Sequence, residues 1–169
     1  MSSDSRKALA AMSEYQPVPW EMIPDLGLYM DQVITFIARM VQPLYGEDMR
    51  GYLSAPMINN YVKDKLIPRP VGKKYSREQI ALLTMIVALK QVSSMDDIRQ
   101  MLILREGESV EQLYTDFCGR FSRAVHAIAQ GDAVDFGGLT SARDFAILAS
   151  ALRAGCSAAL KDEPASPEV

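Results

Sequence analysis

Apolar residues recur every three or four positions through most of the chain, and this spacing predicts a protein built almost entirely of helices. One helix is predicted over residues 28–42, ended by Pro43 because proline cannot continue the helical backbone bonding. A second is predicted over residues 77–91, where Ser76 and Gln79 form a capping box at its start. This second helix is apolar on nearly all sides, which is typical of a central, buried helix.

A shorter helix is predicted between these two. Ser54 is a good N-cap, and the helix reaches about Asp64. Pro68 and Pro70 forbid helix in the connector that follows, and Gly72 supplies a turn, so the connector could form a short two-stranded wing. The residues expected to face inward are Ile58, Tyr61, Val62 and Leu66.

The last part of the chain predicts one short and two long helices. Ser94 opens the short helix, which reaches about Leu104. Gly131 ends the first long helix and Ser141 caps the second, in which many alanines would allow close helix approach. The apolar stripe of the first consists of Val110, Leu113, Tyr114, Phe117, Phe121, Val125 and Ile128. The stripe expected for the second consists of Phe145, Leu148, Leu152, Cys156 and Ala159.

The predicted fold class is therefore all-α, with a winged helix-turn-helix, a small β-wing and a C-terminal helical extension. We expect residues 1–27 to be a loose N-terminal arm followed by an extended segment, and residues 28–105 to be the winged helix-turn-helix domain. Residues 44–53 could be helix or loop. Residues 106–160 would form a helical dimerisation region, and the polar tail 161–169 would be disordered.

Charge changes this picture, because it is unevenly distributed. The whole chain carries a net charge of −3, which by itself argues mildly against a nucleic-acid-binding protein. Residues 54–77, however, hold six basic residues against Asp64 alone, and the flanking parts of the chain are acidic. This basic segment consists of Lys63, Lys65, Arg69, Lys73, Lys74 and Arg77. Salt screens charges over roughly 10 Å, so a local basic segment matters more to an anionic partner than the average charge.

Several classes of protein are disfavoured by the sequence. Cys118 and Cys156 are far apart and form no CxxC pair, so we expect buried small side chains, no disulfide and no metal site; a thiol redox sensor is the less favoured reading. His126 is the only histidine and has no local catalytic partner, so we expect no enzyme activity and no cofactor. The N-terminus lacks a signal-peptide pattern and no apolar run could span a membrane. We therefore expect a cytoplasmic protein.

The residues of the basic segment fit a DNA-binding role. A short helix can enter the major groove, where asparagine can pair with the N6 and N7 atoms of adenine. Asn59, Asn60 and Lys63 share the outward face of the predicted helix and would approach bases. The alternative is structural: the amides could bridge neighbouring elements, and the basic residues could be a solvated face. The residues expected to hold phosphates are Lys65, Arg69, Lys73, Lys74 and Arg77.

The stretches SAPMINNYVKDKLI and PRPVGKKYSREQIALLTMIVALKQVSSMDDIRQML resemble the DNA-binding domain of the mercury-resistance-type (MerR) regulators. More closely, MINNYVK with KKYS and LKQ resembles an uncharacterised bacterial domain-of-unknown-function family (1836). The resemblance covers about residues 54–103 and, more loosely, the helix at 28–42. The matching positions are Tyr61, Leu66, Tyr75, Ser76, Ile80, Leu83, Ile86, Ile98 and Leu102.

This resemblance implies a bacterial transcription factor that binds double-stranded DNA as a homodimer, with a possible small-molecule effector. The sequence departs from the MerR pattern at Asn59, where arginine is usual, at Lys65, where glycine is usual, and at Lys73 or Lys74, which replace a wing arginine. The usual first helix directly before residue 54 is not evident. The alternative function is an adaptor or ligand sensor that keeps the fold without binding DNA.

Overall fold

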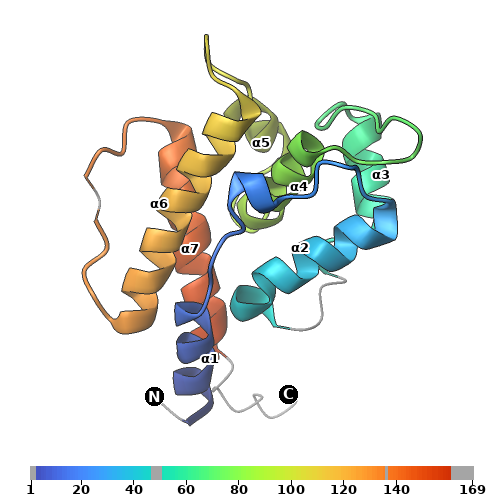
Figure 1. Cartoon of the computed structure of the whole chain (residues 1–169). Helices are drawn as coiled ribbons and strands as arrows, with labels where there is room; N and C mark the ends of the chain where they lie inside the picture. Colours follow the sequence, from blue (N-terminus) through green and yellow to red (C-terminus); the bar gives the residue numbers. More distant parts are fainter. Residues whose placement is uncertain (1–2, 47–50, 136, 161–169) are drawn as a thin grey trace, which may run out of the picture.

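The computed structural model describes residues 3–46, 51–135 and 137–160, and this part of the chain is mainly helical, as the spacing predicts (Figure 1). The predicted tail 161–169 lies outside the described residues. The α-helices in the described ranges are α1 (Ser3–Ser13), α2 (Met30–Tyr45), α3 (Ala55–Lys63), α4 (Arg77–Leu89), α5 (Met95–Met101), α6 (Val110–Gln130) and α7 (Ala142–Leu160), and a 3₁₀ turn η1 spans Trp20–Met22.

Helix α4 is the centre of the molecule. Ser76 and Gln79 form the predicted capping box at its start, and every residue from Gln79 to Leu89 is buried. A helix that is apolar on all sides must be covered on all sides. Helices α2, α6 and α7 all contact α4, and the buried residues form one cluster that extends from Met12 to Ala158.

The N-terminal residues differ from expectation. We predicted a loose arm, but α1 is a helix that packs against α2, α6 and α7. Met12 and Tyr15 are buried, and the Tyr15 ring meets the edge of Phe121 with the ring centroids 5.6 Å apart. The stretch is rich in alanine, a strong helix former, and packing of α1 against the other helices stabilises it further.

The prediction that Pro43 ends α2 is wrong, because α2 continues to Tyr45. A proline inside a helix costs roughly 3 kcal/mol. Leu44 and Tyr45 are both buried, and burying two large side chains contributes a free energy of comparable size and opposite sign. Gly46 then ends the helix with a positive φ of 80°. The ambiguous stretch 44–53 therefore begins as helix, while residues 47–50 lie outside the described ranges.

The predicted strands of the β-wing are not found among the described residues, where only isolated bridges occur. Val71 and Lys74 pair across a tight turn, and Lys74 N–H donates to the Val71 carbonyl at 3.0 Å. Tyr75 pairs with Leu28 through two backbone hydrogen bonds of 2.8 and 3.0 Å. Prolines on both sides of Arg69 remove backbone donors, which explains why a turn forms without flanking strands.

Helices α6 and α7 are the two long helices that the spacing predicts, and they run in the same direction: Arg120 meets Asp144 in the first turn of α7, and Ile128 meets Gly155 near its end (Figure 1). Of the stripe predicted for α7, Leu148 is buried, but most of the other residues face solvent. Phe145 is 59% exposed and Leu152 is 46% exposed, and Cys156 is also exposed. The buried face of α7 instead consists of small residues together with Arg143, Asp144, Ile147 and Leu148. The prediction placed the large apolar residues of α7 on its buried face. The close approach of α7 to α6 instead favours small side chains on that face.

Gly155 tests this close approach. A Cβ atom built at Gly155 would lie 2.7 Å from the Ile128 Cγ2 atom, which is a β-branched methyl that cannot swing away. We expect Gly155→Ala to lower the free energy of unfolding by about 1–2 kcal/mol, since overpacking exceeds the gain in helix propensity. Gly119→Ala in α6 is the matched control, because its Cβ would meet only Arg123 Nη1 at 3.5 Å. That variant should be neutral or slightly stabilising in urea denaturation, and equal effects of the two changes would contradict the packing argument.

Candidate nucleic-acid interface

The outward face of α3 carries the predicted base-reading residues. Ile58 and Tyr61 are buried and hold the helix on the core. Asn59, Asn60 and Lys63 are all exposed, as their positions on the opposite side of the helix require. The structure therefore leaves both amides and the ammonium group open to solvent, and none of the three bridges to another element among the described residues.

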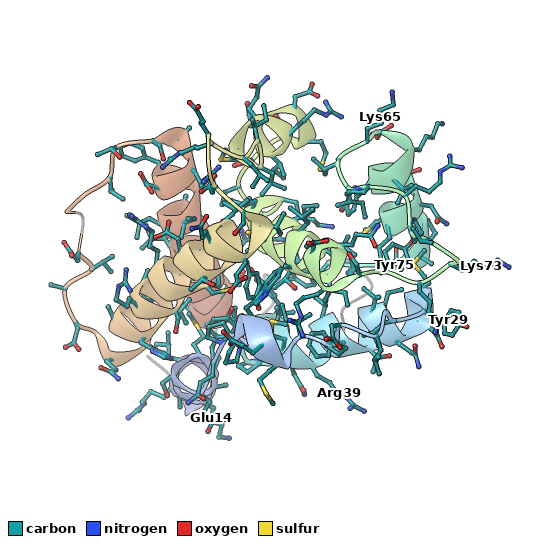
Figure 2. The ribbon with its side chains drawn as sticks, turned by 45° about the horizontal axis from the view of Figure 1, so that its top comes forward. Glu14, Tyr29, Arg39, Lys65, Lys73 and Tyr75 are labelled. Atoms are coloured by element: carbon teal, nitrogen blue, oxygen red, sulfur yellow. The ribbon has the colours of Figure 1, made fainter. Side chains whose placement is uncertain are left out.

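Four of the predicted residues line one hollow at the end of α3. Asn59, Lys63, Lys65 and Arg69 surround a depression of about 690 Å³, whose floor includes Leu66 and Ile67. The four polar residues are exposed, and the three cations among them form no ion pair with any described residue. Figure 2 shows Lys65 and Lys73 pointing outward at the end of the molecule that holds α3.

Two of the lysines have backbone conformations that rarely suit a side chain. Lys65 has a φ of 57° and Lys73 a φ of 63°. The left-handed region costs a non-glycine residue roughly 1 kcal/mol or more, and such strain concentrates at functional sites. Lys65 directly follows Asp64, the C-cap of α3, so its positive φ turns the chain away from the helix. Gly72 and Lys73 both have positive φ, which is the pattern of a type I′ turn.

The base of this turn is fixed to the body of the protein. Lys74 Nζ lies 5.4 Å from the centroid of the Tyr29 ring. Gly27 has a φ of 75°, and a Cβ there would lie 3.0 Å from the Lys74 Cβ, so the two chains approach closely. Gln79 Nε2 donates to the Pro68 carbonyl at 2.8 Å and ties the connector to α4. The turn therefore presents Lys73 and Lys74 at a defined place on the surface.

Arg77 lies apart from the exposed basic residues. Its Nε donates to the Ile23 carbonyl at 2.8 Å, and its Nη2 lies 3.5 Å from the Asp25 carboxylate. Its guanidinium carbon is 5.7 Å from the centroid of the Trp20 ring. The guanidinium thus holds residues 20–25 against the start of α4, and this geometry assigns Arg77 to holding the fold.

Two basic residues near α3 were missed by the sequence reasoning. Arg99 of α5 donates from Nη2 to the Asp64 carbonyl at 3.2 Å, at the end of α3, and also pairs with Asp96. Lys90 Nζ lies 3.5 Å from the Gly51 carbonyl, and burial lowers its pKa. Neither belongs to the basic segment in sequence, so only the folding of α4 and α5 beside α3 places them there.

The thiols and the histidine have structural surroundings. Cys118 is buried, and burial raises its pKa to about 12, so its thiol stays protonated at neutral pH. Cys156 is exposed on α7, contrary to the expectation that it is buried. His126 Nε2 lies 2.8 Å from the Tyr15 carbonyl, which can only accept a hydrogen bond, so Nε2 carries the hydrogen. Within the described ranges, no group of three or more potential metal ligands occurs.

The helices of the described segments include none with both the length and the apolar character needed to cross a bilayer. The fold and the site together define a mainly helical protein with an exposed, locally basic end. Residues 18–117, more than half of the chain, match the family described as Domain of unknown function (DUF1836), and the chain belongs to that family. No curated protein and no solved structure matches the chain significantly.

Replacing Arg77 tests its structural assignment. Arg77→Ala should release residues 20–25, since it removes one hydrogen bond to a carbonyl and the contact with Trp20. We expect a loss of about 1–2 kcal/mol in stability. Trp20 is the only tryptophan, so its fluorescence should shift to longer wavelength and become easier to quench. Arg69→Ala is the control at an exposed arginine, and unchanged Trp20 fluorescence in Arg77→Ala would refute the assignment.

Proposed function

We propose that this protein is a cytoplasmic bacterial transcription regulator without catalytic activity. It binds double-stranded DNA through a region of the winged helix-turn-helix type, here called the head, which consists of α2, α3 and the turn with Lys73 and Lys74. The observation that supports this most is the joint exposure of Asn59, Asn60 and Lys63 on α3 beside a hollow with further unpaired cations. DNA is the partner that meets both requirements, since its phosphates attract the cations and its base edges match an amide.

In this proposal α3 enters the major groove. Asn59 or Asn60 pairs with adenine, and Lys63 approaches the neighbouring base or phosphate. Lys65 and Arg69 contact the backbone on one side of the groove, and the turn with Lys73 and Lys74 contacts it on the other. Phosphate contacts position the helix and supply affinity on any sequence, whereas the amides discriminate between sequences.

Helix α2 takes the part of the first helix of the motif, with a longer connection to α3 than a tight turn. Contacts between α2 and α3 support this arrangement. The type I′ turn takes the part of the wing, although no strands flank it in the described residues. A wing needs only a rigid, cationic loop beside the groove, and the bridge between Leu28 and Tyr75 anchors this one.

The rival function is an adaptor that keeps the fold and binds another protein. Burial of Asn59 and Asn60 against the N-terminal segment would favour that function, because the amides would then be structural. Both are exposed, and the N-terminal segment contacts α4 and α6 through Arg77 and Tyr114 instead. The exposure of the amides therefore favours DNA.

The test starts from selection of bound DNA from a random pool at two salt concentrations, followed by affinity measurements on the selected and on unrelated sites. Lys73→Ala with Lys74→Ala should weaken binding to both and flatten the dependence of affinity on salt, since two phosphate contacts are lost. Asn59→Ala should weaken binding only to the selected site, by roughly 1–3 kcal/mol.

A matched control is Lys7→Ala with Arg39→Ala, which removes two positive charges outside the basic segment. Unchanged affinity in this control separates a local contact from a change in net charge. If the control and the Lys73–Lys74 variant lose the same affinity for DNA, the loss is due to net charge and not to a local contact. Wild-type affinity for DNA in both head variants would contradict the assignment of these residues.

We propose in addition that the protein is a homodimer through the outer face of α7. Phe145, Leu152 and Leu160 are exposed apolar residues on that face, with Cys156 between the last two. Their spacing follows one side of a helix, so a two-fold axis could pair the row with itself. A second copy is the expected occupant, because DNA-binding heads of this type reach adjacent half-sites as dimers.

Sedimentation equilibrium in the presence of a reductant tests the dimer. We expect wild-type protein to be dimeric at micromolar concentration and Leu152→Asp to be monomeric, with little loss of monomer stability because the side chain is 46% exposed. Ile103→Asp is the control, since Ile103 is 59% exposed outside α7. A monomeric wild-type protein would contradict the proposed dimer and would leave the proposal of DNA binding unaffected.

A further inference from the structure

A cavity of about 280 Å³ lies between α6, the connector to α7 and the first turns of α7. The connector bows outward from the two helices in Figure 1, and Val134, Asp135 and Leu139 of the connector line the cavity. The apolar part of its wall consists of Ala124, Ala127, Ala133, Val134, Leu139, Ile147 and Leu148. This site is far along the chain from the basic head and lies outside residues 18–117.

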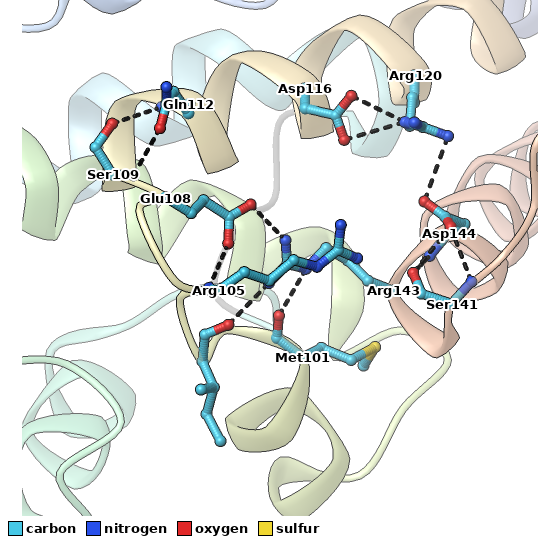
Figure 3. Close-up of polar contacts among 11 residues, drawn as sticks. Met101, Arg105, Glu108, Ser109, Gln112, Asp116, Arg120, Ser141, Arg143 and Asp144 are labelled. Atoms are coloured by element: carbon cyan, nitrogen blue, oxygen red, sulfur yellow. Dashed lines mark hydrogen bonds and ion pairs between the residues drawn. The ribbon is translucent and has the colours of Figure 1, made fainter.

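Two arginines on one side of α6 form the polar end of the cavity. Arg120 Nε lies 3.0 Å from both oxygens of Asp116, and its Nη1 lies 3.3 Å from Asp144 Oδ1 (Figure 3). These contacts fix the guanidinium in place, and its Nη2 bonds no described residue. Arg123, one turn further on, forms no ion pair with any described residue, and its Nη1 lies beside Gly119.

The carboxylates of the cavity are already committed or exposed. Asp144 accepts hydrogen bonds from the backbone N–H groups of Thr140 and Ser141 at 3.0 and 2.9 Å. These hydrogen bonds and the nearby charge of Arg120 lower the pKa of Asp144. Asp135 accepts from Gly137 N–H at 2.7 Å and faces solvent, where water screens its charge. The groups left to bind a ligand are therefore the donors of Arg120 and Arg123 above an apolar wall.

We propose that this cavity binds a small organic carboxylate with an apolar body. Two neighbouring guanidiniums suit a carboxylate because charge-assisted bonds from planar donors match its two oxygens. The apolar wall covers the rest of the molecule. Ligand pockets for drug-sized molecules measure about 300–1,000 Å³, so this cavity suits a ligand of one ring and not an extended cofactor.

The test is an NMR titration of the full-length protein with benzoate and phenylacetate, and with benzamide and benzylamine as neutral and cationic counterparts. We expect saturable shifts from the two carboxylates, confined to residues that line the cavity. Arg123→Gln should weaken that binding about tenfold or more, because a charge-assisted bond is lost. Arg105→Gln is the matched control, since Arg105 is exposed and does not line the cavity.

Three outcomes would overturn the proposal: no saturable shifts with either carboxylate at tens of millimolar, equal shifts with benzylamine, or equal binding by wild type and Arg123→Gln. Arg123 forms no ion pair with any described residue, so the variant should melt at the wild-type temperature, and its spectrum reports that it is folded. No DNA is present in the titration, so its result does not depend on the proposed function.

Discussion

The structure depends on the burial of α4 from Gln79 to Leu89. A helix with no polar face cannot lie at a surface, so other helices have to enclose it. Helices from both ends of the chain do so, and the head with α2 and α3 shares its core with α6 and α7. Buried residues before and after residue 105 therefore belong to one core, and the boundary that we predicted there does not separate two cores.

The second connection between the two ends is the segment 18–25. Tyr114 of α6 donates to the Val18 carbonyl at 2.7 Å, and the Tyr114 ring lies against Trp20. Arg77 holds the other side of the same segment at the start of α4, two residues from Tyr75 in the base of the turn. The family match begins at Val18 and ends just beyond Tyr114, so it encloses this connection and leaves out α1, α7 and the cavity. Helix α6 therefore carries both a contact of the head and a wall of the proposed ligand site.

The charges of the protein divide into two kinds with different physical roles. Arg77 and Arg143 are partly or wholly buried, and their donors bond backbone carbonyls and carboxylates; Arg143, for example, bonds the Met101 and Ile103 carbonyls and Glu108 (Figure 3). Such pairs hold elements together because an uncompensated buried charge is costly. The lysines of the basic segment are exposed and form no ion pair with any described residue, and two of them have an unfavourable φ. They contribute little to stability, which leaves them available to a partner.

Local patterns determined much of this protein before folding was considered. The helical spacing, the capping boxes at Ser76 and Ser109, and the position of Asn59, Asn60 and Lys63 on the outside of α3 all depend on residues within a few positions of one another. Contacts between distant segments decided the rest. They make α1 a helix, carry α2 past Pro43, turn the small face of α7 inward, remove Arg77 from the exposed basic residues, and bring Arg120 and Arg123 to a cavity. Each of these features depends on the free energy of burying or pairing groups far apart in the chain, and no local spacing contains that information.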